Sequence, residues 1–108
     1  MADDRNKNRV LLDLNNEVFQ ENWFALDKGE REHVTNALQK IRRLTWDQVY
    51  RDSGLKWEKV TSIDPPKGID AIYTLRVTQS RRATAYRDGD FMRFLTIPPD
   101  HGAAYGEK

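Results

Sequence analysis

Apolar residues recur at helical spacing in the middle of the chain. Asp27, with Glu30 three residues later, is a capping-box-like signal for the start of a helix. Intervals of three and four residues then build one apolar stripe, which predicts a helix that begins after Asp27. The members of this stripe are Val34, Ala37, Leu38, Ile41 and Leu44.

Shorter patterns surround this helix. An apolar run within residues 9–14 favours a first strand, although the same run could equally begin a helix. Apolar residues at helical spacing over 18–26 predict a helix that ends near Leu26. Thr45 and Gln48 repeat the capping pattern, which predicts a third helix from Trp46 to about Arg51.

The second half of the chain carries strand signals. Residues 57–60 predict a short, partly exposed strand, and the loop at 64–68 contains two prolines and a glycine. Residues 71–77, 82–87 and 91–98 predict three further strands. Asp88-Gly89 predicts a type I′ hairpin turn between the last two. The order of one strand, three helices and four strands predicts an α+β fold, with two to three helices packed on a C-terminal antiparallel sheet.

Composition narrows the class of protein. A length of 108 residues fits one domain, here expected over 1–108 with residues 1–8 as a flexible terminus. No apolar run is long enough for a membrane span, and no secretion signal precedes the domain, which predicts a cytoplasmic protein. The chain has no cysteine and two distant histidines, so neither a disulfide nor a metal or other cofactor is expected.

Net charge is +1, but positive charge concentrates in the predicted sheet. Strand alternation places Arg76, Arg82 and Tyr86 together on a face away from the helices, while Ala83 and Ala85 lie beneath them. Guanidinium groups beside an aromatic ring suit phosphate and base recognition, which would make an RNA-binding surface. The same pattern also fits the solvated face of any antiparallel sheet.

These strands carry a family resemblance. The segments IYTLRV (72–77), RATAYRDGD (82–90) and FLTIPPDHGAAYG (94–106) resemble successive segments of the RelE/ParE superfamily, including its HigB-related members. These proteins are toxins of type II toxin-antitoxin systems. The segments WFALDK (23–28) and ALQKI (37–41) resemble the corresponding helices, so the resemblance covers most of the chain and implies a RelE-like fold.

The resemblance implies a metal-independent, ribosome-dependent mRNA endonuclease, or mRNA interferase, that inhibits translation. Its partners would be the ribosome, mRNA and a cognate antitoxin bound in a hetero-oligomer. The RNA 2′-hydroxyl would attack the adjacent phosphodiester. Arg76 and Arg82 would stabilise phosphate charge, His101 would act as general acid or base, and Tyr105 would stack on a base or assist proton transfer.

Simpler roles remain open for several of these residues. His101 could be a hydrogen-bonded histidine in the turn after the last strand, and Tyr105 could anchor a short tail. Lys56, Lys59 and Lys67 could meet the RNA backbone or could simply be solvated lysines. The three tryptophans are expected at the core or its rim rather than as stacking platforms.

Two other functions fit the resemblance. A ParE-like protein would bind DNA gyrase as an inhibitor, without catalysis. A non-catalytic interaction module would share only the fold and its partner complex. The near-neutral net charge, unlike the strongly basic character of ribosome-dependent toxins, favours the module, whereas His101 and Tyr105 favour the nuclease.

Overall fold

The computed structural model describes residues 9–98 of the chain. A short strand, β1 (Leu11–Asp13), precedes three helices, α1 (Glu17–Ala25), α2 (Lys28–Ile41) and α3 (Trp46–Arg51). Four strands follow: β2 (Glu58–Val60), β3 (Ile72–Arg76), β4 (Arg82–Asp88) and β5 (Phe91–Thr96). The predicted order of elements and the α+β class are confirmed.

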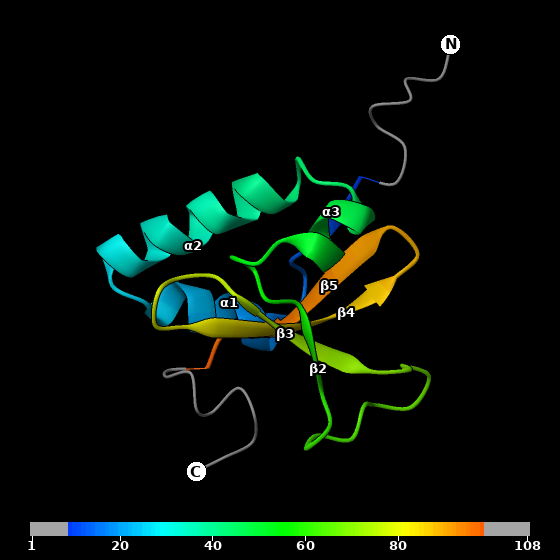
Figure 1. Ribbon diagram of the computed structural model, residues 1–108. Helices are drawn as coiled ribbons and strands as arrows, with labels where there is room; N and C mark the ends of the chain where they lie inside the picture. Colours follow the sequence, from blue (N-terminus) through cyan, green and yellow to red (C-terminus); the bar gives the residue numbers. More distant parts are fainter. Residues whose placement is uncertain (1–8, 99–108) are drawn as a thin grey trace.

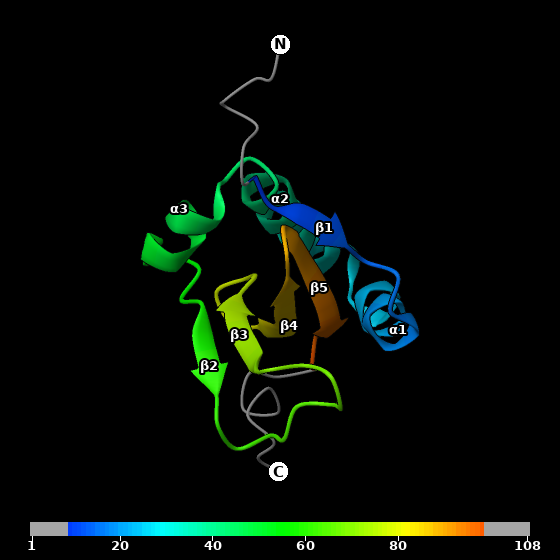
Figure 2. The same cartoon turned by 90° about the vertical axis from the view of Figure 1, so that its right-hand side faces the viewer.

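The five strands form one mixed sheet in the order β1-β5-β4-β3-β2. Strands β2 to β5 pair antiparallel, as predicted, whereas β1 pairs parallel to β5. Figure 2 shows β1 and β2 at the two edges, with α1 beside the β1 edge. The first and last strands of the chain are therefore neighbours in the sheet.

Side-chain caps define the starts of the helices. Asp27 accepts from the backbone N–H of Glu30, and Thr45 forms a complete capping box with Gln48. The carboxylate of Glu30 instead binds Arg81, so the predicted box at Asp27 is one-sided. Asn16, which the sequence pattern did not single out, caps α1 by accepting from two backbone N–H groups.

The hairpin between β4 and β5 differs from its prediction in turn type. Asp88 pairs with Phe91, so the two loop residues are Gly89 and Asp90 rather than Asp88 and Gly89. Gly89 has a φ of 63°, whereas the positive-φ residues do not include Asp90. A positive φ at the first loop position alone matches a type II′ turn and excludes type I′, because type I′ needs it at both positions.

One face of the sheet, called here the helix face, packs against the helices to form the core. Figure 1 shows α2 along one side of the sheet and α3 near the β4–β5 hairpin. Ala83 and Ala85 are fully buried there, as predicted, and the Phe19 ring of α1 lies 5.2 Å from that of Phe94 in β5. The buried apolar residues of the helices are Phe19, Val34, Leu38, Ile41, Trp46 and Val49.

An ion-pair network fixes the β1 edge. Arg93 of β5 donates to the carboxylates of Asp13 in β1 and Asp88 in β4. The backbone N–H of Asn15 and the Arg93 guanidinium hold the pKa of Asp13 below its ordinary value of 3.8. A single arginine thus ties three strands together. No helix within residues 9–98 is long and apolar enough to cross a membrane.

Replacing Gly89 by alanine should destabilise the protein by about 1–2 kcal/mol, because a Cβ disfavours the left-handed backbone of the turn. Urea unfolding followed by circular dichroism measures this change. Gly29→Ala is the control, since Gly29 lies in α2 with room for a Cβ, and it should raise stability by up to about 1 kcal/mol. Equal effects of the two substitutions would contradict the turn assignment.

The Asp13 interactions predict a pH dependence of stability. Because the folded pKa is depressed, the stabilisation is fully present above about pH 4 and is lost as the pH falls through the folded pKa. Asp13→Asn should therefore unfold at lower urea than the wild type at pH 7, and the gap should narrow in acid. Asp64→Asn, in the exposed loop after β2, is the control for the loss of one surface carboxylate.

Candidate functional site

The face of the sheet opposite the helix face, called here the open face, carries most of the predicted site. The pairing of β3 with β4 sets Arg76 directly opposite Arg82 and Thr74 opposite Thr84. Tyr73 and Leu75 point the other way, since Tyr73 stacks on Trp57 and Leu75 lies in the core. The predicted division of these strands into two faces is therefore correct.

Arg82 is buried on the open face, with only 7% of its surface exposed. Its Nε and Nη2 donate to Thr74 Oγ1 at 3.2 and 2.8 Å, and Nη2 also donates to the Lys56 carbonyl at 2.8 Å. The Glu58 carboxylate lies 3.5 Å from Nη2. The sequence predicted a guanidinium exposed to phosphate, but this one is buried and joins β4 to β3 and to the segment that leads into β2.

Arg76 is the cross-strand partner of Arg82 on the open face, and its side chain is exposed. Its backbone N–H donates to the Leu55 carbonyl at 2.7 Å, which holds the end of β3 against the segment before β2. No ion pair to its side chain occurs within residues 9–98. Of the two predicted phosphate ligands, Arg76 is the accessible one.

The backbone around Lys56 is shaped to meet Arg82. Burial opposes ionisation of Asp52, but backbone N–H groups of Leu55 and Gly54 and the Lys40 ammonium keep the pKa of this carboxyl below its ordinary value. Lys56 follows with a φ of 51°, in the left-handed region that non-glycine residues rarely adopt. This turn presents the Lys56 carbonyl to the buried guanidinium. Lys56, Thr74, Arg76 and Arg82 are called the arginine corner below.

The remaining predicted RNA contacts do not gather at the arginine corner. Lys59 pairs with Tyr73, so alternation places it on the helix face. Lys67 lies in the loop between β2 and β3. Tyr86 shares the open face with Arg82 but lies four residues along β4, about 13 Å away. It sits opposite Arg93, whose charge is matched by Asp13 and Asp88.

A hollow of about 400 Å³ indents the open face. Its walls come from Val18 and Asn22 of α1, Ile72 of β3 and Leu95 of β5. Thr84 and Thr96 also line it and share a hydrogen bond of 2.6 Å between their hydroxyl oxygens. Because Thr84 faces Thr74, the Arg82 partner, the hollow adjoins the arginine corner.

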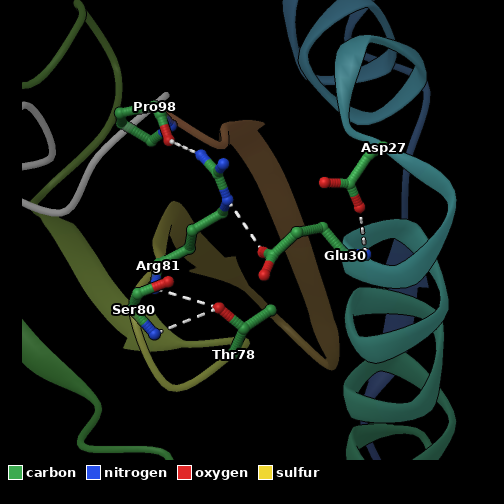
Figure 3. A network of polar contacts seen from close by, with 6 residues as sticks. All are labelled: Asp27, Glu30, Thr78, Ser80, Arg81 and Pro98. Atoms are coloured by element: carbon green, nitrogen blue, oxygen red, sulfur yellow. Dashed lines mark hydrogen bonds and ion pairs between the residues drawn. The ribbon is translucent and has the colours of Figure 1, made fainter.

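A second network places the end of β5 near the start of β4. Arg81 Nε donates to Glu30 at 2.9 Å, and its Nη1 lies 3.4 Å from the Pro98 carbonyl (Figure 3). The Thr78 hydroxyl accepts from the backbone N–H groups of Ser80 and Arg81, which shapes the turn between β3 and β4. The chain therefore leaves β5 beside Arg81, the neighbour of Arg82.

His101 and Tyr105 lie outside the described residues, so their predicted roles remain predictions. Within 9–98, no three histidine, aspartate or glutamate side chains form a group that could hold a metal ion. Of the five arginines from 76 to 93, three meet carboxylates through Glu30, Glu58, Asp13 and Asp88. The open face is thus less positive than the sequence suggested.

Sequence reasoning missed an aromatic group on the helix face. The Trp57 ring stacks on Tyr73 at 4.6 Å and meets Trp46 edge-on at 5.3 Å. The Arg87 guanidinium lies 4.5 Å from the centre of the Trp46 ring. Strand alternation puts Arg87 on the helix face with Ala83 and Ala85, but the pattern gave no sign that α3 would bring Trp46 and Tyr50 to it.

Comparison of the chain with models of known protein families, with curated proteins and with solved structures found no match.

The two arginines of the corner should differ in their effect on stability. Arg82→Ala leaves Thr74 and the Lys56 carbonyl without their donor and should lower the free energy of unfolding by about 2–4 kcal/mol. Arg76→Ala, in the same cross-strand pair, should change it by less than about 0.5 kcal/mol, because that side chain is exposed. Urea unfolding measures both, and a stable Arg82→Ala protein would refute the structural role.

Proposed function

We propose that this protein is the toxin of a type II toxin-antitoxin system, of the RelE/ParE kind. It acts in the cytoplasm as a ribosome-dependent mRNA endonuclease that needs no metal, and a cognate antitoxin holds it inactive. The observation that carries the proposal is the arginine corner, where exposed Arg76 stands beside buried Arg82 and the hollow of the open face. This arrangement supports binding of a phosphate next to a base.

When an RNA 2′-hydroxyl attacks the adjacent phosphodiester, the protein must meet four catalytic requirements. The strand must be held in line, the 2′-hydroxyl must lose its proton, the phosphorane charge must be stabilised and the 5′-leaving oxygen must be protonated. We assign the phosphate contact to Arg76, because its side chain is exposed. Arg82 would hold Thr74 and the Lys56 backbone around that contact through its hydrogen bonds, as a positioning residue.

His101 is the proposed proton-transfer group. It follows Pro98 by three residues, a chain length of at most about 11 Å. Pro98, the last described residue before His101, lines the hollow, and its carbonyl accepts from Arg81. An imidazole, with an ordinary pKa of about 6.5, can accept or donate a proton at cellular pH. Tyr105 is proposed to stack on a base.

The charge distribution supports dependence on the ribosome. Affinity for isolated RNA rests largely on the number of phosphates neutralised by free cations. The net charge is only +1, and most of the sheet arginines already meet carboxylates. Weak intrinsic affinity suits a protein that meets its mRNA only where the ribosome holds the strand in place.

An interaction module is the second candidate, and one observation favours it. Helix α1 exposes large apolar side chains, with Val18 50% and Phe24 67% accessible. Val18 also lines the hollow of the open face, so this apolar surface adjoins the candidate site. A protein partner, whether an antitoxin or a target such as gyrase, could cover both.

Inducible expression with mapping of transcript ends tests the proposal. The wild type should arrest growth and create new ends within translated messages. Arg76→Ala should reduce cleavage by about tenfold to a hundredfold, the effect of losing one charge-assisted hydrogen bond in the transition state. The single variant His101→Ala should abolish most of the cleavage seen with the wild type.

Arg43→Ala is the matched control, since Arg43 is exposed on the connection between α2 and α3. Hydrogen bonds from Val10 to Leu44 and from Leu11 to Asp90 place that connection at the hairpin end of the sheet, away from the arginine corner. Growth arrest without new ends would exclude the nuclease. Loss of supercoiling by purified gyrase would then identify the inhibitor, and no effect on either target would leave the interaction module.

A further inference from the structure

A pocket of about 410 Å³ opens on the helix face, on the side of the sheet opposite the arginine corner. It lies where α3, the segment entering β2 and the β4–β5 hairpin come together. Its lining combines aromatic rings with one basic and one acidic side chain. These side chains belong to Tyr50, Trp57, Tyr73, Arg87 and Asp70, and Ala71 and Gly89 complete the lining.

The aromatic wall is fixed in place before any ligand binds. Trp57 and Tyr73 are parallel within 9° at 4.6 Å, and both are half-buried. Tyr50 is 52% exposed, and its ring lies 5.8 Å from that of buried Trp46. Rigid aromatic surface of this kind binds flat rings without losing much side-chain freedom.

Arg87 is oriented but not neutralised. Its Nε donates to the Gly89 carbonyl and its Nη1 to the Tyr50 hydroxyl, both at 2.7 Å. Within residues 9–98, no carboxylate pairs with it, in contrast to Arg81, Arg82 and Arg93. Its Nη2 therefore keeps its capacity to donate to an anion.

Asp70 restricts which anion fits. The Asp70 carboxylate repels a ligand that carries negative charge and no hydrogen-bond donor. It accepts hydrogen bonds from a ligand that also carries N–H groups. A flat ring with amino or imino donors, joined to a phosphate, satisfies the aromatic wall, Asp70 and Arg87 together. Nucleobases of single-stranded RNA are recognised by this combination of stacking and hydrogen bonding.

We propose that this pocket binds a nucleoside phosphate, with the base against the aromatic wall of Tyr50 and the stacked Trp57–Tyr73 pair, its amino group on Asp70 and its phosphate on Arg87. The pocket lies on the helix face, so it is separate from the arginine corner. Its ligand binding does not depend on the proposed ribonuclease activity.

Tryptophan indole resonances give a direct test, because Trp57 lines the pocket and Trp23 lies on α1. Titrating the labelled protein with 5′-GMP should shift the Trp57 indole N–H signal saturably and leave that of Trp23 unchanged. Guanosine and inorganic phosphate should each bind at least about tenfold more weakly than 5′-GMP, since each lacks one half of the ligand. No saturable shift at Trp57, or phosphate binding as tightly as 5′-GMP, overturns the proposal.

Two variants assign the roles. Arg87→Ala should weaken 5′-GMP binding by about tenfold, whereas Arg43→Ala should bind like the wild type. Because Arg87 also contacts Trp46 and could support the fold, Asp70→Asn provides an independent test on an exposed loop residue. Asp70→Asn should narrow the preference for 5′-GMP over 5′-IMP, which lacks the 2-amino group. Wild-type binding by a folded Arg87→Ala protein overturns the proposal.

The source of the ligand is read from one further titration. A short single-stranded RNA of guanosines that binds at least about tenfold more tightly than 5′-GMP identifies a strand as the natural ligand. Equal affinity identifies a free nucleotide, and either result supports the pocket. Cleavage assays and nucleotide titrations test the two sites separately. If the nuclease proposal fails, the titration of this pocket with 5′-GMP is unaffected and can still succeed or fail by itself.

Discussion

The buried guanidinium of Arg82 is the interaction on which the open face depends. It joins Thr74 of β3, the carbonyl of Lys56 and the carboxylate of Glu58, three groups that approach from different parts of the chain. A charge placed at this depth is tolerated only when its donors are satisfied. The left-handed backbone at Lys56 and the Asp52 turn before it are the local features that supply one of those acceptors.

The same constraint separates the two arginines that the sequence treated as equivalent. Both lie on the open face, at directly paired positions of β3 and β4. Arg82 is enclosed by β2 and its approach, whereas Arg76, the last residue of β3, stays in solvent. Burial makes one residue a structural link and leaves the other available to a ligand, so position along the strand decides the role more than residue type.

Local signals predicted most of the fold, because capping residues, apolar stripes and strand alternation act over a few residues. They located α2 and α3 and divided β3 and β4 into two faces. The parallel pairing of β1 with β5 and the type II′ turn were missed, since each depends on register between strands. For the site, alternation found the face but not the burial of Arg82, nor the meeting of Arg87 with α3, which arises only from tertiary packing.

The pairing of β1 with β5 has a consequence for synthesis of the chain. Asp13 and Arg93 are 80 residues apart, yet their contact and the parallel ladder beside it close one edge of the sheet. A nascent chain can form α2 and α3 from local contacts, but it cannot complete this edge until β5 has been made. The open face is therefore complete only after β5 has been synthesised, and a shorter nascent chain carries an incomplete form of it.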